Sequence, residues 1–154
     1  MKHTRICNLA RGLLIALAIL AIAWVLRPRS FADVTGMERA TDFYITSRDS
    51  AMDLLESRPS REEIGPLLDR GTLRFQGRQR HIEWTDSQRL YHVYFDRAEE
   101  GQWVSGTRFS LRSDGALYMP LYVGDLSLGY TWYQLSGCDM DAVNAELQRL
   151  LGMT

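Results

Sequence analysis

The chain has 154 residues, of which 45% are hydrophobic and 24% charged, a composition typical of a globular protein. Its charge is uneven: residues 1–30 hold five basic and no acidic residues, whereas the remainder holds all 19 Asp and Glu against 13 Arg. Nucleic-acid binding requires a basic surface. The acidic charge of residues 31–154 therefore excludes nucleic acid as a partner.

An apolar run from Gly12 to Leu26 contains no charged side chain. Since lipid offers the backbone no hydrogen-bond partners, this run predicts a transmembrane signal-anchor helix over residues 12–26, which can extend back to Ile6 to gain length. Three basic residues precede the run and two follow it, which favours a short cytoplasmic N-terminus at residues 1–11. The bilayer is then the first predicted partner, through residues 12–26.

A cleaved signal peptide is the alternative interpretation of the same run. Ser30, Phe31 and Ala32 place small residues at a cleavage-like spacing near Ala32, and cleavage there would release a secreted protein. Arg27 and Arg29 lie between the apolar run and that site and oppose cleavage. Both interpretations place the body outside the cytoplasm, and the retained anchor predicts a single-pass protein of a bacterial cell membrane.

Residues 27–33 are expected to form a juxtamembrane connection, and residues 34–154 a single extracytoplasmic α+β domain. Residues 42–46 are rich in aromatic and β-branched side chains and predict a strand, whereas residues 50–57 suit a short helix or a turn. Ser60 and Glu63 match a capping box, which opens a short helix before Gly71.

Alternating apolar and polar residues then predict a sheet with one buried face. Alternating segments lie near residues 73–76, 82–84, 91–96, 109–112, 116–121 and 130–135, and the expected sheet has five or six strands. Asp114 and Gly115 suit a two-residue hairpin turn. A last helix begins at Asp139, carries one apolar stripe and ends at Gly152. The predicted fold is α+β: one transmembrane helix, then an antiparallel sheet with about two helices packed on one face.

No spacing of His, Cys, Asp or Glu predicts a metal site, and no glycine-rich loop predicts a phosphate or cofactor site. Two histidines, His81 and His92, fall on neighbouring predicted strands, where Glu83 and Asp96 could join them as an acid–base cluster. Solvated strand residues are the simpler interpretation. We therefore predict no catalytic, cofactor-binding or metal-binding residue. Cys138 is expected to be a small buried side chain rather than a reactive thiol.

Two groups of side chains form the candidate binding surface. The first is aromatic, and its consecutive Trp132 and Tyr133 must point to opposite faces of one strand. The second is basic and shares one strand face if the alternation continues through Gly77. The candidate residues are Tyr130, Trp132 and Tyr133, and Arg74, Arg78 and Arg80.

The function expected from these features is a membrane-anchored module that binds or regulates another envelope or membrane protein. The alternatives are an envelope enzyme whose site is assembled from residues distant in sequence, and a secreted protein released near Ala32.

Overall fold

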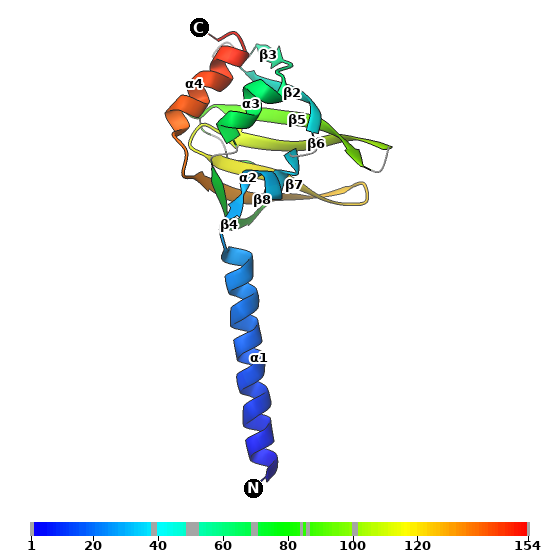
Figure 1. Cartoon of the computed structure of the whole chain (residues 1–154), viewed down its shortest axis with the longest axis vertical. Coiled ribbons are helices and arrows are strands. Elements are labelled where there is room, and N and C mark those ends of the chain that lie inside the picture. Colours follow the sequence, from blue (N-terminus) through cyan, green and yellow to red (C-terminus); the bar gives the residue numbers. More distant parts are fainter. Residues whose placement is uncertain are drawn as a thin grey trace.

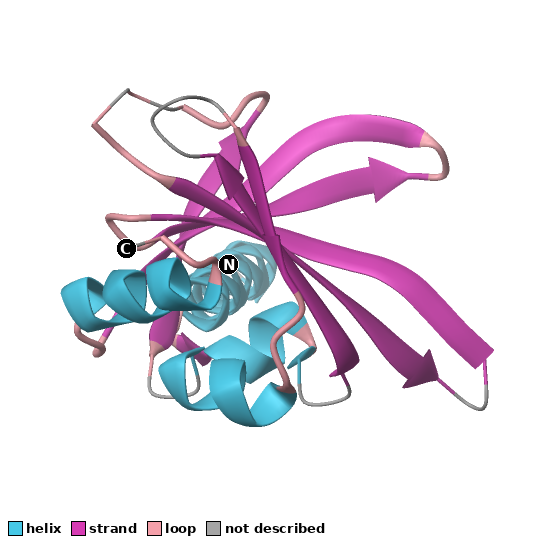
Figure 2. Ribbon diagram, turned by 90° about the horizontal axis from the view of Figure 1, so that it is seen from above, coloured by secondary structure: helices cyan, strands magenta, loops and turns pink. Residues whose placement is uncertain are grey.

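The computed structural model describes residues 2–37, 40–48, 53–68, 71–83, 85, 87–99 and 102–153. These ranges form an α+β structure with an eight-stranded antiparallel sheet and four helices (Figures 1 and 2). The predicted fold class is thereby confirmed. Across the described ranges, no helix is both long enough and apolar enough to cross a bilayer, so the transmembrane part stays a prediction.

The four helices are α1 (Lys2–Leu26), α2 (Phe31–Thr35), α3 (Arg61–Leu68) and α4 (Met140–Leu150). The first half of the sheet comes from β1 (Arg29–Ser30), β2 (Ala40–Arg48), β3 (Leu54–Ser57) and β4 (Thr72–Gln79). The second half comes from β5 (Leu90–Glu99), β6 (Gln102–Arg112), β7 (Ala116–Val123) and β8 (Leu126–Ser136).

The strand order is β1-β4-β8-β7-β6-β5-β2-β3. The prediction missed the short strands β1 and β3, and it included a strand that Ile82 and Glu83 do not form. Residues 54–57, predicted as part of a short helix or turn, form β3 because they pair with β2 along the sheet edge. Ile82 and Glu83, predicted in a strand, lie in the loop between β4 and β5, and Trp84 lies outside the described residues.

One face of the sheet carries the hydrophobic core. Strand pairing brings its apolar side chains into register across the sheet, as in the row formed by Ile45 of β2, Val93 of β5 and Phe109 of β6. Helices α2, α3 and α4 cover this face, as Figure 2 shows from above. The buried side chains Val143 and Leu147 of α4, with Leu151 at its C-cap, confirm the predicted apolar stripe.

The predicted helix caps are present. Ser60 and Glu63 exchange hydrogen bonds at the start of α3: the Ser60 amide donates to the Glu63 carboxylate (2.8 Å), and the Glu63 amide donates to the Ser60 hydroxyl (3.3 Å). Asp139 caps α4 by accepting from the amides of Asp141 and Ala142. Local sequence therefore fixes where these helices begin.

The turn between β6 and β7 differs in length from the prediction. Its loop has three residues, Ser113, Asp114 and Gly115, rather than two. Gly115 adopts φ 88° and donates its amide to the Arg112 carbonyl (2.9 Å). A turn followed by a glycine in the left-handed region is a common way to close a three-residue hairpin.

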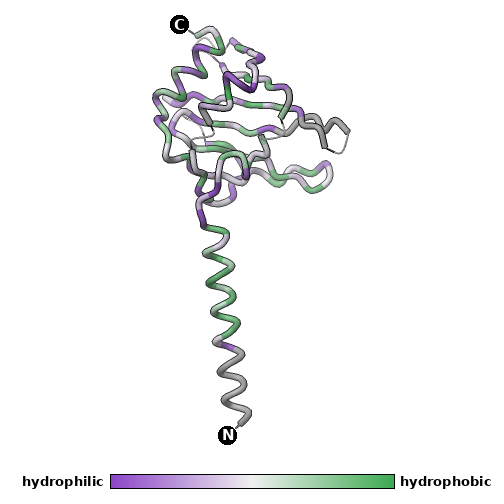
Figure 3. The backbone as a smooth tube through the Cα atoms, in the orientation of Figure 1, coloured by the Kyte–Doolittle hydropathy of each residue, from purple (hydrophilic) through white to green (hydrophobic). Residues whose placement is uncertain are grey.

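α1 projects from the domain as a single helix (Figure 1), and its second half is apolar along its length (Figure 3). The chain then joins the domain at once. Arg29 and Ser30 pair with β4, and Phe31 is completely buried, with its ring edge-on to Phe109 at 5.3 Å. Part of the range assigned to a juxtamembrane connection thus belongs to β1 and α2.

Candidate binding face

The face of the sheet opposite the helices is the candidate functional site, and we call it the open face. One row of paired residues crosses it from β2 to β8: Thr46, His92, Ser110, Tyr118 and Trp132. Open faces of antiparallel sheets usually carry solvated polar side chains.

An aromatic cluster occupies the β7–β8 part of the open face. The ring of Tyr118 stacks on Trp132, with 6.2 Å between centroids and 23° between planes, and meets Tyr130 edge-on at 6.5 Å. Tyr118 is only 1% exposed, whereas Trp132 and Tyr130 are half-buried. A rigid inner ring therefore supports two outer rings that remain accessible.

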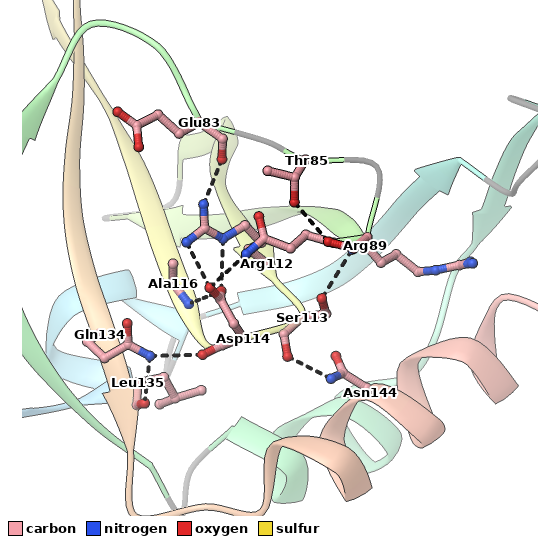
Figure 4. A network of polar contacts seen from close by, with 12 residues as sticks. Glu83, Thr85, Arg89, Arg112, Ser113, Asp114, Ala116, Gln134, Leu135 and Asn144 are labelled. Carbon is pink, nitrogen blue, oxygen red and sulfur yellow. Dashed lines mark hydrogen bonds and ion pairs between the residues drawn. The ribbon is translucent and has the colours of Figure 1, made fainter.

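Arg112 holds this cluster from the side. Its guanidinium lies 5.8 Å from the centre of the Tyr118 ring, within cation–π range. The same group donates to both carboxylate oxygens of Asp114 (2.9 and 2.8 Å) and to the Glu83 carbonyl (2.7 Å), as Figure 4 shows. Arg112 thus links the aromatic cluster to the loop between β4 and β5.

The Asp114 turn ties several elements together. Gln134 of β8 donates to the Asp114 carbonyl (2.9 Å), and Asn144 of α4 donates to the Ser113 carbonyl (2.8 Å). The backbone amide of Arg89, at the end of the loop, donates to the Ser113 hydroxyl (3.1 Å). Because helix, sheet and loop all bond to one turn, this end of the open face is preorganised for binding.

Electrostatics keep both members of the ion pair charged. The hydrogen bond from Arg112 to Asp114, against a smaller opposing effect of burial, raises the pKa of Arg112. Burial alone would raise the pKa of Asp114, but the hydrogen bonds and charge of Arg112 outweigh it and lower that pKa. Burial also raises the pKa of Tyr118, so its phenol stays protonated.

The β2–β5–β6 part of the open face holds a second group. The rings of Tyr44 and Tyr94 lie 5.9 Å apart on paired strands, and Arg108 donates to the Tyr122 hydroxyl. The Nδ1 of His92 lies 2.8 Å from the Ser110 hydroxyl. Burial, then the charges of Arg108 and Arg48, lower the pKa of His92, so this imidazole is neutral at pH 7.

The four residues considered as an acid–base cluster come from two elements that are not adjacent in the sheet. His92 and Asp96 lie on β5, whereas His81 and Glu83 lie in the loop after β4. The strands β4 and β5 are not neighbours as predicted, because β6, β7 and β8 lie between them in the sheet. His81 instead lines a surface pocket beside Leu128 and Tyr130.

The basic group is divided between the two faces. Arg74 is paired with Gln134 and lies on the open face, as expected. A β-bulge between Phe75 and Gly77 then shifts the register, so that Arg78 pairs with Thr131 and lies on the opposite face. The expectation of one shared arginine face is therefore wrong. Arg80 follows the end of β4 and lines the pocket that contains His81.

The aromatic residues separate as predicted for consecutive strand positions. Trp132 and Tyr130 lie on the open face, whereas Tyr133 lies on the core side and packs edge-on against Phe75 at 5.9 Å. Sequence reasoning missed Tyr44, Tyr94 and Arg108 as members of the open face. These residues alternate along their strands with the buried Phe43, Val93 and Phe109, and this alternation could have placed them on the open face.

No group of three or more His, Cys, Asp or Glu side chains in the described ranges is placed to hold a metal ion. Cys138 is half-buried with its sulfur 3.8 Å from that of Met140, and burial raises the pKa of its thiol. No protein-family model, curated protein or solved structure matches this chain.

Proposed function

We propose that this protein is a single-pass membrane-anchored binding module, with α1 in the bilayer and the α+β domain outside the cytoplasm. The observation that carries the proposal is the exposure of apolar side chains on every side of α1, a helix that extends away from the domain. The domain acts by binding through the open face rather than by catalysis.

Ten large apolar side chains of α1 are exposed, among them Leu14 (66%), Leu17 (53%) and Leu20 (65%). At about 100° per residue, Leu13, Leu14 and Ile15 point to three sides of the helix, and Ile19 and Leu20 cover the remaining side. A helix that is apolar all round requires an apolar environment. Moving ten such side chains out of water contributes on the order of 10 kcal/mol, comparable to the stability of a whole domain.

The geometry of the helix fits a bilayer if α1 contributes more than its apolar run. Residues 12–26 rise roughly 22 Å, less than the hydrocarbon thickness of roughly 30 Å. α1 continues as a helix back to Lys2, so residues 6–11 supply the missing length. Arg11 lies inside that extension and reaches the headgroups by extending its side chain along the helix.

The end of α1 has the residues of a membrane–water interface. The guanidinium groups of Arg27 and Arg29 lie 5.2 and 4.9 Å from the centre of the Trp24 ring. Tryptophan and arginine at one helix end favour the level of the lipid headgroups. The three basic residues before the apolar run favour an N-terminus in the cytoplasm and a domain outside it.

Retention of the anchor is favoured over cleavage near Ala32. Such cleavage would remove Phe31, which is completely buried against Phe109. It would also remove β1 and Ser30, whose hydroxyl accepts from the Asp33 amide (3.1 Å) to cap α2. A secreted protein cleaved near Ala32 would therefore lack the Phe31 side chain from its hydrophobic core.

The open face supports binding of another envelope or membrane protein. Trp132 and Tyr130 are accessible rings on a rigid support, and aromatic and arginine side chains dominate the energetics of protein interfaces. The candidate acid–base residues come from two elements that are not adjacent in the sheet, and this supports binding over catalysis.

Alkaline carbonate extraction tests the anchor. The wild-type chain is expected in the membrane pellet, and the double variant Leu17→Arg/Leu20→Arg in the supernatant, because each arginine costs roughly 3 kcal/mol at the centre of a membrane helix. The matched control is Leu126→Arg, at a leucine of similar exposure (64%) outside α1, which stays in the pellet. Equal extraction of wild type and double variant would overturn the proposal.

Topology and binding need two further measurements. A cysteine at the exposed position Ala145 of α4, with Cys7 and Cys138 replaced by alanine, is expected to react with a membrane-impermeant thiol reagent in intact cells. A photo-crosslinking residue at position 132 is expected to join a discrete partner, whereas the same residue at position 145 does not. Failure of labelling at position 145 contradicts the extracytoplasmic placement, and equal crosslinking at both positions contradicts the open face.

A further inference from the structure

A pocket of about 210 Å³ lies where the end of α1 meets the domain, and we call it the junction pocket. Its lining comes from the last turn of α1, the connection, β1, β4 and β8. The pocket therefore lies where the end of the proposed anchor meets the folded domain.

Three arginines line the junction pocket, Arg27, Arg29 and Arg78, and the lining contains no acidic side chain among the residues that the structure describes. Arg78 reaches this side only because the β-bulge at Gly77 reverses the face of β4. Gly77 has φ 149°, a backbone conformation that other residues rarely adopt. The local backbone thus places a third positive charge beside the two that follow α1.

The remaining lining matches the surroundings of a lipid headgroup. Leu73, Phe75 and Val25 supply an apolar wall, and Tyr133 and Thr131 bring hydroxyl groups. The volume is several times the roughly 30 Å³ that one water molecule occupies in the liquid, so the pocket has room for a phosphate group. The Trp24 ring, which lies against the guanidinium groups of Arg27 and Arg29, favours the membrane–water interface. It therefore places the pocket at the level of the lipid headgroups.

We infer that the junction pocket binds the phosphate of an anionic phospholipid headgroup. Guanidinium groups bind phosphate oxygens through paired charge-assisted hydrogen bonds, and three arginines line this pocket with no carboxylate among its described lining residues. The inference rests on the proposed function, since α1 must hold the pocket at the membrane surface. Bound lipid would fix the orientation of the domain, and with it the direction in which the open face points.

Arginine footprinting of the full-length protein tests this inference. The protein in non-ionic detergent is treated with phenylglyoxal, and modification at each arginine is measured by mass spectrometry with and without phosphatidylglycerol. Arg78 is expected to be modified about tenfold more slowly with the lipid, corresponding to about 1.4 kcal/mol of protection. Arg74, on the same strand but the opposite face, is the internal control and is expected to keep its rate.

Two further ligands distinguish a lipid headgroup from free phosphate as the group that the pocket binds. Inorganic phosphate at the same concentration is expected to leave the rate at Arg78 unchanged, and equal protection by inorganic phosphate would assign the pocket to a free anion. Phosphatidylcholine is expected to protect less than phosphatidylglycerol, because its headgroup carries no net charge. Protection of Arg74 and Arg78 to the same extent would overturn the inference as non-specific attraction.

A variant pair completes the test. Native mass spectrometry is expected to detect one bound phosphatidylglycerol molecule on the wild-type protein. The Arg78→Gln variant is expected to lose this lipid, and the Arg74→Gln variant to retain it. Both variants must still float with vesicles, because α1 is intact. Unchanged lipid retention in Arg78→Gln overturns the inference alone, whereas a wild-type chain that fails to float overturns the proposed function.

Discussion

Phe31 is the side chain through which the start of the domain is fixed to its core, and its truncation gives the sharpest stability prediction. The ring is completely buried and meets Phe109 edge-on at 5.3 Å. Phe31→Ala removes this ring from a site closed by α2 and β6, which cannot collapse without moving both. Such substitutions typically cost about 3–5 kcal/mol of the free energy of unfolding.

Urea unfolding of the full chain in detergent micelles, followed by tryptophan emission, measures this effect. With a denaturant slope of about 2 kcal/mol per molar, the midpoint is expected to fall by about 2 M. The control is Leu54→Ala at the exposed edge strand β3, where the side chain is 54% exposed and the expected loss is below about 0.5 kcal/mol. A midpoint shift in Phe31→Ala no larger than that of the control would refute the assignment of Phe31 to the core.

Three further substitutions probe the open face and its edge. Asp114→Asn weakens the bond to Arg112 and is expected to cost about 1 kcal/mol near pH 7 in denaturant titrations, allowing for solvent screening of a partly exposed pair. Because the pKa of Asp114 is lowered in the fold, that cost is expected to disappear as the pH falls through its folded value; a cost independent of pH would contradict this. The lowered pKa of His92 means that stability is fully present above the unfolded value near 6.5 and is lost as the pH falls, and His92→Gln is expected to flatten this slope in a pH series of melting temperatures. Gly129→Ala places a methyl group 2.3 Å from a backbone oxygen at the end of β4 and is expected to lower the melting temperature well beyond Gly124→Ala, which also has positive φ but open space; equal losses would show that backbone strain alone acts.

Local features of the sequence predicted the starts of the helices well. The capping box at Ser60 and the Asp139 cap depend on side chains that bond to amides two or three residues away, so neighbouring residues suffice to define them. The separation of Trp132 and Tyr133 also follows from strand geometry alone.

Features that depend on partners distant in sequence were not predictable. Residues 54–57 form a strand at the edge of β2 that the distant strand β5 leaves free, whereas Ile82 and Glu83 lie in a loop despite their alternation. Strand order placed His81 and His92 far apart, since three strands lie between β4 and β5. An alternating pattern identifies a strand but does not name its neighbour.

By itself, the sequence determined the α+β class, the caps of α3 and α4, and the apolar stripe of α4, because each depends on composition or on residues within a few positions of one another. Only the tertiary structure decided which side chains share the open face and which side Arg78 faces. A single extra residue at the Gly77 bulge moves every later side chain of β4 to the face opposite the one that its alternation predicts. The bulge depends on pairing with β8, which lies more than fifty positions further along the chain.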